Sequence, residues 1–313
     1  MLRMLLRRLA LSIPLLFIVT ILTFVVTGLT PGSAAATILG TSATAAKIAQ
    51  LNRSLGLDQP IIVQYWHWLV NAAQGNLGVS TFTAEPVTTI LASGLPVTLT
   101  LIAGAVIVAV VLGVPLGVLS ARRAKSGGQV IDALSLIGFA VPNFFLGLIF
   151  GFVFSNILEW LPASGWVDPS QSVSGWLASI VLPVATIGIP GAALIARQTR
   201  QGMIEVLNRD YIRSLRARGL SETSIIYKHG LRNAMGNVVT LLGLYIVGLL
   251  LGTTLVESVF AMQGIGTIAV NATTQHDLPV LEGASLYFTI VVIVAFLAVD
   301  LVRAWLNPKL RTR

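Results

Sequence analysis

Long apolar stretches alternate with shorter polar segments along the whole chain. Six stretches of at least 21 residues are almost entirely apolar. A helix needs about 20 such residues to cross roughly 30 Å of hydrocarbon. Val141–Asn143 reads VPN and can kink the third stretch, because proline removes a backbone donor. The pattern therefore predicts six membrane-spanning helices, at residues 9–29, 95–121, 130–158, 176–196, 236–256 and 284–306.

Composition supports a membrane protein. Of the 313 residues, 55% are hydrophobic and only 10% are charged, and the mean hydropathy is +0.86. A soluble domain typically has about 25% charged residues. We therefore expect an all-α integral membrane protein.

The distribution of charge predicts the orientation. Eighteen of the twenty Lys and Arg residues fall on one side of the six predicted helices, together with five acidic residues. The other side has only Lys47 and Arg53, with seven acidic residues. Basic residues concentrate in cytoplasmic loops, so both termini are expected in the cytoplasm. The net charge of +8 thus follows membrane topology and does not indicate nucleic-acid binding.

The same pattern divides the chain into regions. Residues 1–30 form a first helix, whose 21-residue apolar stretch exceeds the 7–15 residues typical of a cleaved signal peptide, so we expect a retained anchor. Residues 31–94 form an extracytoplasmic segment that includes the amphipathic run IIVQYWHWLV. Residues 95–306 hold the other five helices, with a cytoplasmic loop at 197–233, and residues 307–313 form a basic cytoplasmic tail.

Motifs for chemistry are missing from the sequence. There is no HExxH, no G-x-x-x-x-G-K-[ST] phosphate-binding loop and no cysteine, and the three histidines fall in three different segments. We expect no catalytic residue, no metal site and no cofactor in this chain, which is not expected to be an enzyme. Carboxylates near the middle of the predicted helices are also missing, which argues against an ion-coupled transporter.

The loop at 197–233 is the most informative segment. Residues 201–218 contain no proline and one glycine, so a helix is expected, ending at Gly219. Ser221 can cap a second short helix, with Glu222 beside its positive end. Such a pair of helices can dock a cytoplasmic partner, or it can rest as a basic segment on anionic lipid. The residues alone leave both possibilities open.

A family resemblance distinguishes between them. The loop reads DYIRSLRARGL…KHGLRNA, which resembles the permease B branch of ATP-binding-cassette (ABC) importers for dipeptides, oligopeptides and nickel. The general signature of these importers is EAA-x3-G-x9-I-x-L-P, of which Gly219 and Leu231 match the glycine and the leucine. Arg213, Ser214 and Leu215 replace EAA, as is typical of the peptide branch. Resemblance extends to LGLDQP, GNLGVS, VPNFFLGL, LPASG, VESVFAMQGIG and HDLPVLEG, although Gln263 stands where the family more often has proline.

The resemblance implies a type I ABC importer permease fold in the cytoplasmic membrane of a prokaryote. It implies pairing with a homologous C-type permease subunit, one or two cytoplasmic ATPases that bind ATP and magnesium, and an extracytoplasmic solute-binding protein. The residues implied in docking the ATPase are Asp210, Arg213, Arg216, Ala217, Arg218, Gly219, Leu220, Ser221, Glu222, His229 and Leu231.

The expected function is import of dipeptides or oligopeptides by alternating access. Alternatives are the same class of importer carrying nickel or another small solute, a non-transporting membrane scaffold or sensor, and, third, a secondary transporter. Asn143, Phe144 and Phe145 are candidates for lining the pathway, with core packing as the competing role for the two phenylalanines.

Overall fold

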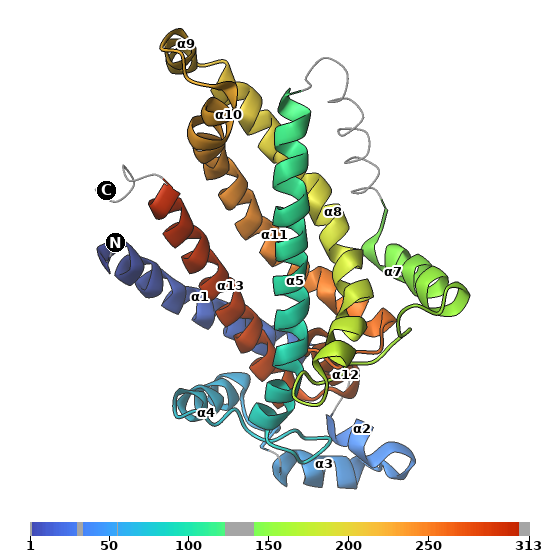
Figure 1. Ribbon diagram of the computed structural model, residues 1–313. Coiled ribbons are helices and arrows are strands. Elements are labelled where there is room, and N and C mark those ends of the chain that lie inside the picture. Colours follow the sequence, from blue (N-terminus) through green and yellow to red (C-terminus); the bar gives the residue numbers. More distant parts are fainter. Residues whose placement is uncertain (1, 30–33, 55, 123–140, 307–313) are drawn as a thin grey trace. The chain divides into compact units, whose positions relative to one another are not determined.

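The structure, a computed structural model, describes residues 2–29, 34–54, 56–122 and 141–306. Within these ranges the chain is helical and contains no strand; one isolated bridge joins Val79 and Pro86. The α-helices (Figure 1) are α1 (Leu2–Leu29), α2 (Ala34–Leu39), α3 (Ala45–Ser54), α4 (Ile61–Ala73), α5 (Val87–Arg122), α7 (Asn143–Gly151), α8 (Val173–Leu207), α9 (Asp210–Ala217), α10 (Glu222–Ser224), α11 (Leu231–Val259), α12 (Ile265–Gln275) and α13 (Leu278–Leu306). The 3-10 helix η1 spans Gly40–Ser42, and two π-helices, η2 (Phe152–Ile157) and η3 (Ile225–Gly230), extend α7 and precede α11.

Five helical stretches among the described residues are long and apolar enough to cross a membrane. They are Leu6–Leu29, Val87–Arg122, Val173–Leu207, Glu222–Val259 and Leu278–Leu306. Each contains one of the predicted stretches entirely. Of the remaining predicted helix, residues 130–140 lie outside the described residues, and Asn143–Ile157 is a shorter apolar helix. Pro142 caps the start of α7 in an extended conformation, with φ −59° and ψ 134°.

Several helices run beyond the predicted limits. α5 begins at Val87, so its first turns belong to the segment predicted as extracytoplasmic. α8 continues past residue 196 because buried positions recur at helical spacing through Thr199, Met203 and Val206. Arg209, with φ −73° and ψ 149°, separates α8 from α9. The prediction of a single helix over residues 201–218 is therefore wrong.

The described chain forms two compact units. Unit 1 comprises the described residues within 1–2, 99–262 and 294–313, and unit 2 comprises those within 3–98 and 263–293.

In unit 1, close helix packing positions the ends of α8 and α11. A Cβ on Gly117 of α5 would lie 2.5 Å from the Ala196 carbonyl oxygen of α8, and one on Gly113 would lie 2.6 Å from the Ala192 oxygen. Glycine is thus required for the two backbones to approach. Ala109, Ile195 and Val238 form a buried cluster from α5, α8 and α11.

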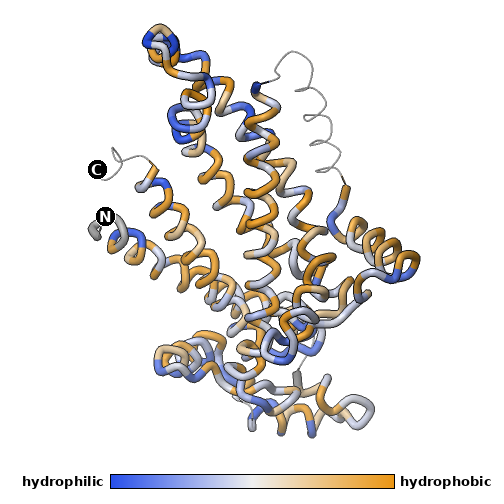
Figure 2. The backbone as a smooth tube through the Cα atoms, in the orientation of Figure 1, coloured by the Kyte–Doolittle hydropathy of each residue, from blue (hydrophilic) through white to orange (hydrophobic). Residues whose placement is uncertain are grey.

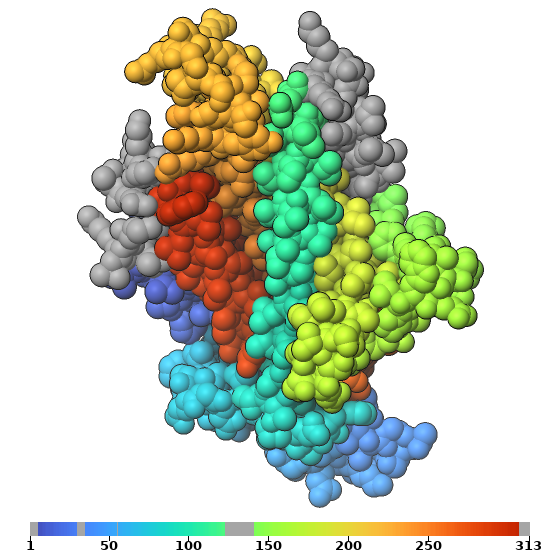
Figure 3. Space-filling model, in the orientation of Figure 1, coloured from blue at the N-terminus to red at the C-terminus, as the bar shows by residue number. Residues whose placement is uncertain are grey.

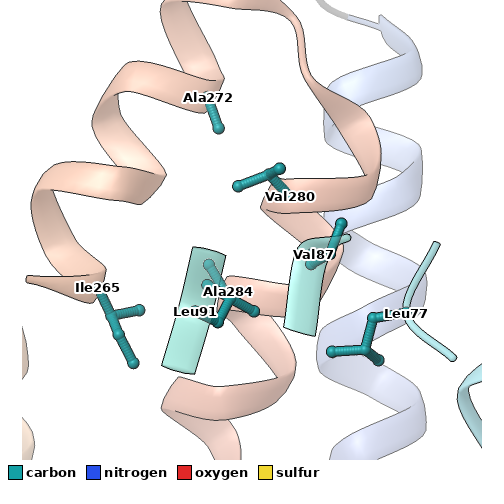
Figure 4. Packing of buried hydrophobic residues seen from close by; sticks show 7 residues of the cluster. All are labelled: Leu77, Val87, Leu91, Ile265, Ala272, Val280 and Ala284. Carbon is teal, nitrogen blue, oxygen red and sulfur yellow. The ribbon is translucent and has the colours of Figure 1, made fainter. Parts of the chain in front are cut away.

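In unit 2, a separate hydrophobic core joins segments that are far apart in sequence. Figure 4 shows its side chains, contributed by the loop before α5, by α5 itself, and by α12 and α13: Leu77, Val87, Leu91, Ile265, Ala272, Val280 and Ala284. The predicted amphipathic run forms α4, whose Tyr65 contacts Phe24 of α1 edge to face at 5.3 Å between ring centroids.

A buried carboxylate also holds unit 2 together. Asp277 accepts hydrogen bonds from the Ser80 hydroxyl, from the Thr81 amide at 3.2 Å and from the Thr81 hydroxyl at 3.3 Å. These bonds fix the loop before α5 against the start of α13.

Candidate functional site

The segment that joins α8 to α11, residues 208–230, is the principal candidate, and we refer to it as the connection. It contains α9, α10 and η3 and lies at one end of unit 1 (Figure 1). Hydrophilic residues alternate with apolar ones at α9 and α10, whereas α8 and α11 are apolar along most of their length (Figure 2). The space-filling view shows α9 and α10 at the surface of unit 1 (Figure 3).

A glycine turn separates α9 from α10. Gly219 has φ +79°, a conformation that L side chains rarely adopt. The Gly219 amide donates to the Arg216 carbonyl at 3.0 Å, and the Leu220 amide donates to the Leu215 carbonyl at 3.3 Å. This is the hydrogen-bond pattern of a Schellman motif. Apart from its chain neighbours, no atom of the described residues lies within 4 Å of a Cβ placed on Gly219, so backbone conformation, and not crowding, requires glycine there.

An ion pair spans this turn. The Arg216 Nε atom lies 2.6 Å from Glu222 Oε1, and its Nη2 atom lies 3.3 Å from Oε2. The hydrogen bond to Glu222 raises the pKa of Arg216, so the guanidinium stays charged. The two side chains are 44% and 56% exposed, so solvent screens the pair and it adds little to stability. Its effect is to orient both charges.

The start of α10 is capped as the sequence predicts. The Ser221 hydroxyl accepts a hydrogen bond from the Ser224 amide at 3.4 Å, which satisfies one of the free donors at the helix start. Glu222 occupies the first turn, where its charge is favoured by the helix dipole. The turn and the cap together define the geometry of the exposed part of the connection, residues 213–222, which we call the tip.

The underside of the connection is apolar and buried. Ile212 of α9 and Ile225 of η3 have no exposed surface. Ile226 joins a core cluster with Met203 of α8 and Ala234 of α11. Burying one such side chain contributes about 1.5–3 kcal/mol. The connection is therefore fixed on the ends of the long helices and does not hang as a free loop.

The predicted docking residues fall into two groups on this support. Eight are exposed: Asp210, Arg213, Arg216, Ala217, Arg218, Gly219, Ser221 and Glu222. Leu220, His229 and Leu231 are only partly exposed, and Leu231 packs against the core cluster. The structure thus gathers the first group on the exposed surface and places Leu231 among the anchoring residues.

Two exposed aromatic residues were missed by the sequence reasoning. Tyr211 is 37% exposed and Tyr227 is 48% exposed. The Tyr211 hydroxyl accepts a hydrogen bond from Asn233 Nδ2 at 3.0 Å, which links α9 to α11. Large exposed aromatics beside arginines are typical of protein interfaces.

The predicted pathway residues separate in the structure. Asn143 lines a pocket of about 340 Å³ in unit 1, together with Pro190 of α8 and Tyr245 of α11. The Tyr245 hydroxyl donates to the Ile187 carbonyl at 2.7 Å. This bond links α11 to α8 one turn before Pro190. Phe144 is 42% exposed and Phe145 is 51% exposed, and neither lines the pocket. Neither ring is buried among the described residues of this chain.

Within the described residues, no group of three or more His, Cys, Asp or Glu side chains lies close enough together to hold a metal ion.

Comparison with known proteins identifies matches over nearly the whole chain. Residues 113–312 match a family model described as "binding-protein-dependent transport system inner membrane component", and residues 1–102 match the model for the N-terminal part of such membrane components.

Curated relatives match at similar length. A putative peptide transport system permease protein of Brucella abortus (strain 2308) is 36% identical over 98% of each chain. The glutathione transport system permease protein GsiC of Escherichia coli (strain K12) is 38% identical over 99% of each chain.

A solved structure shares the fold. The match, from the MetNI methionine ABC transporter in an inward-facing conformation, has a TM-score of 0.56 and 21% identity, and covers 72% of this chain and 100% of the other. At that identity, the match establishes a shared type I ABC importer permease fold and nothing about cargo.

Proposed function

We infer the function from one premise: this chain belongs to the family of binding-protein-dependent transport system inner membrane components. It is an integral membrane protein and the permease subunit of an ABC importer. From this starting point we propose its cargo, its orientation, its partners and the role of the connection.

The proposed role of the connection is to dock a cytoplasmic ATPase. The observation that carries this proposal is an exposed basic tip mounted on a buried apolar base. Arg213, Arg216 and Arg218 are exposed, whereas Ile212 and Ile225 below them are fully buried. Because α9 follows α8 closely and η3 runs directly into α11, a displacement of the tip would be transmitted to both long helices.

The proposed orientation places the connection and both termini in the cytoplasm. It is supported by the concentration of eighteen of the twenty basic residues on that side of the predicted helices. The membrane would be the cytoplasmic membrane of a prokaryote, as in the bacterial relatives. Residues 31–94 would then be extracytoplasmic.

The proposed partners are those of a complete importer. A homologous C-type permease would supply the other half of the pathway, one or two ATPases would bind and hydrolyse ATP with magnesium, and a solute-binding protein would deliver cargo. The pocket beside Asn143 supports a pathway role for this residue, because its side chain amide there can meet a polar solute. The exposed Phe144 and Phe145 would face lipid or the partner permease.

The proposed mechanism is alternating access. ATP binding would draw the ATPases together and pull the two connections of the permease pair closer, which opens the pathway outward. Hydrolysis would reset it inward. A shift from 1:99 to 99:1 between two states requires about 5.5 kcal/mol of differential binding. The anchored base of the connection allows such energy to reach the membrane helices.

The proposed cargo is a dipeptide or short oligopeptide. Relatives of 36% identity are named as peptide transport permeases, and one of 38% identity is named for glutathione, itself a small peptide. Nickel or another small solute remains the alternative within the class. Membership of a transport-system family argues against a scaffold or sensor, and the ABC permease fold argues against a secondary transporter.

Uptake by reconstituted importer tests this function. Proteoliposomes that contain this permease with its partner permease, ATPases and binding protein are expected to accumulate a labelled dipeptide when ATP is enclosed with the ATPases. Uptake is expected to persist when an uncoupler collapses the proton gradient. Uptake that needs the gradient and not ATP would contradict the proposal, and uptake of nickel ions in place of the dipeptide would contradict the peptide assignment.

A further inference from the structure

A cavity in unit 2 has no role in the function described so far. It has a volume of about 290 Å³, is partly open to solvent, and lies between α4, the loop before α5 and the start of α13. Its lining residues include Phe24, Gln64, Trp68, Asn71, Thr81 and Glu282. All of its lining belongs to unit 2.

Among the described residues that line this cavity, Glu282 carries the only carboxylate. Its side chain has no exposed surface, and neither carboxylate oxygen has a hydrogen-bond partner among the described residues. No lysine or arginine is among the described residues of its lining. A buried carboxylate without partners is costly, so its presence in a native fold points to a functional role or to a bound group that completes it.

A purely structural role does not account for Glu282. Asp277, five residues earlier in the chain, is also buried and accepts bonds from the Ser80 hydroxyl and from the amide and hydroxyl of Thr81. Unit 2 therefore supplies partners to a carboxylate that holds its segments together. Glu282 receives none of these.

Trp68 provides the complementary group. Its indole N–H can only donate a hydrogen bond. The Nε1 atom is buried and has no acceptor among the described residues. The ring lies 6.0 Å from Phe24 between centroids, and both rings line the cavity. The cavity thus offers a negative acceptor, a neutral donor and aromatic surface.

This set of groups selects one ligand chemistry. No group of three metal-ligating side chains lies together in the described residues, so a divalent cation would be poorly coordinated. An anion would be repelled by Glu282. A protonated amine satisfies the carboxylate and gains from the aromatic rings. A carbonyl oxygen next to that amine would accept from the Trp68 indole.

We propose that this cavity binds the N-terminal ammonium group and first carbonyl of a short peptide, with Glu282 as the ammonium acceptor and Trp68 as the carbonyl donor. A volume of about 290 Å³ lies near the lower end of ligand pockets, at roughly 300 Å³, so it holds the end of a peptide and not a long one. The choice of a peptide rests on the proposed function, whereas the amine chemistry rests on the cavity itself. In the proposed orientation the site would receive cargo on the extracytoplasmic side.

Binding to the full chain in lipid nanodiscs, followed by calorimetry, tests the proposal without ATPases or transport. The probes are Ala-Ala, N-acetyl-Ala-Ala and propylamine. Ala-Ala is expected to bind, and acetylation, which removes the positive charge, is expected to weaken binding by at least about tenfold, as for a hydrogen bond to a charged group. Equal binding of the acetylated and free dipeptides, or no binding of Ala-Ala, would overturn the proposal.

Substitutions test the proposed roles of Glu282 and Trp68 separately. Glu282→Gln keeps the size of the side chain and is expected to weaken Ala-Ala binding by at least about tenfold. Glu85→Gln, which removes an exposed carboxylate of the same unit, is the matched control and is expected to bind as the wild type. Trp68→Phe is expected to weaken Ala-Ala binding but not propylamine binding. Unchanged Ala-Ala binding by Glu282→Gln would refute the assignment.

The two proposals fail separately. A chain that supports peptide uptake in proteoliposomes but does not bind Ala-Ala in nanodiscs overturns the cavity site and leaves the proposed function intact. A chain that binds Ala-Ala through Glu282, in an importer that does not transport peptides, overturns the proposed cargo and leaves the cavity site intact.

Discussion

Replacing Gly219 by glutamate is expected to reduce peptide uptake to background while the permease still inserts in the membrane. A Cβ at this position meets no other atom, so the variant can fold, and a non-glycine residue at φ +79° costs only about 1–2 kcal/mol. The added carboxylate, however, would stand at the exposed tip beside Arg218 and between the permease and its ATPase. Uptake per inserted permease, quantified in proteoliposomes, measures the effect.

Two further variants separate docking from backbone strain. Gly219→Ala carries the strain without the charge or the bulk, and is expected to retain most of the uptake. Gly165→Glu is the matched control, because Gly165 also has a positive φ of +98° and no atom within 4 Å of a built Cβ, but lies outside the connection. If Gly219→Glu transports normally, or if Gly165→Glu loses uptake equally, the docking role of the tip is wrong.

Reversing two exposed charges on α9 and its C-terminal cap is expected to release the ATPase. Arg213 Nη1 lies 3.6 Å from Asp210 Oδ1, and the two side chains are 77% and 96% exposed. Arg218 has no ion pair among the described residues. Both guanidinium groups are therefore available to a partner. Because a close charge pair across an interface contributes about 1.5 kcal/mol or more, Arg213→Glu with Arg218→Glu is expected to reduce the co-purified ATPase at least tenfold.

A control of equal charge lies elsewhere in the chain. Lys47→Glu with Arg53→Glu reverses the two basic residues predicted on the extracytoplasmic side, both of them exposed, and is expected to leave ATPase association unchanged. Association of the wild type is also expected to weaken as salt is raised. Full retention of the ATPase by the Arg213 and Arg218 variant would contradict the docking role of these arginines.

Much of the connection could be predicted because its signals are local. A glycine after a helix-forming run predicted the turn at Gly219, and the positive φ and the Schellman hydrogen bonds are its structural counterpart. Likewise, Ser221 followed by Glu222 predicted the capped start of α10. Conformational preferences of single residues determine such features, so they can be read without knowing the fold.

Other features depend on tertiary packing and left no local signal. The break at Arg209 has neither proline nor glycine beside it; it allows Ile212 to turn into the core of unit 1. The burial of Glu282 depends on α4 and on the loop before α5, about 200 residues away in the chain. Asn143 lines the pocket in unit 1, whereas Phe144 and Phe145 do not, and this difference depends on which face of α7 meets α8 and α11.

Cross-linking from the tip of the connection tests the central claim most directly. The chain has no cysteine, so a single cysteine introduced by Ala217→Cys, at an exposed position next to Arg218, is a unique reporter. In the assembled importer, a short bifunctional maleimide is expected to join this cysteine to the ATPase, and ATP is expected to change the yield. An introduced cysteine that reacts with maleimide equally fast in the lone permease and in the complete importer, without joining the ATPase, would contradict the account.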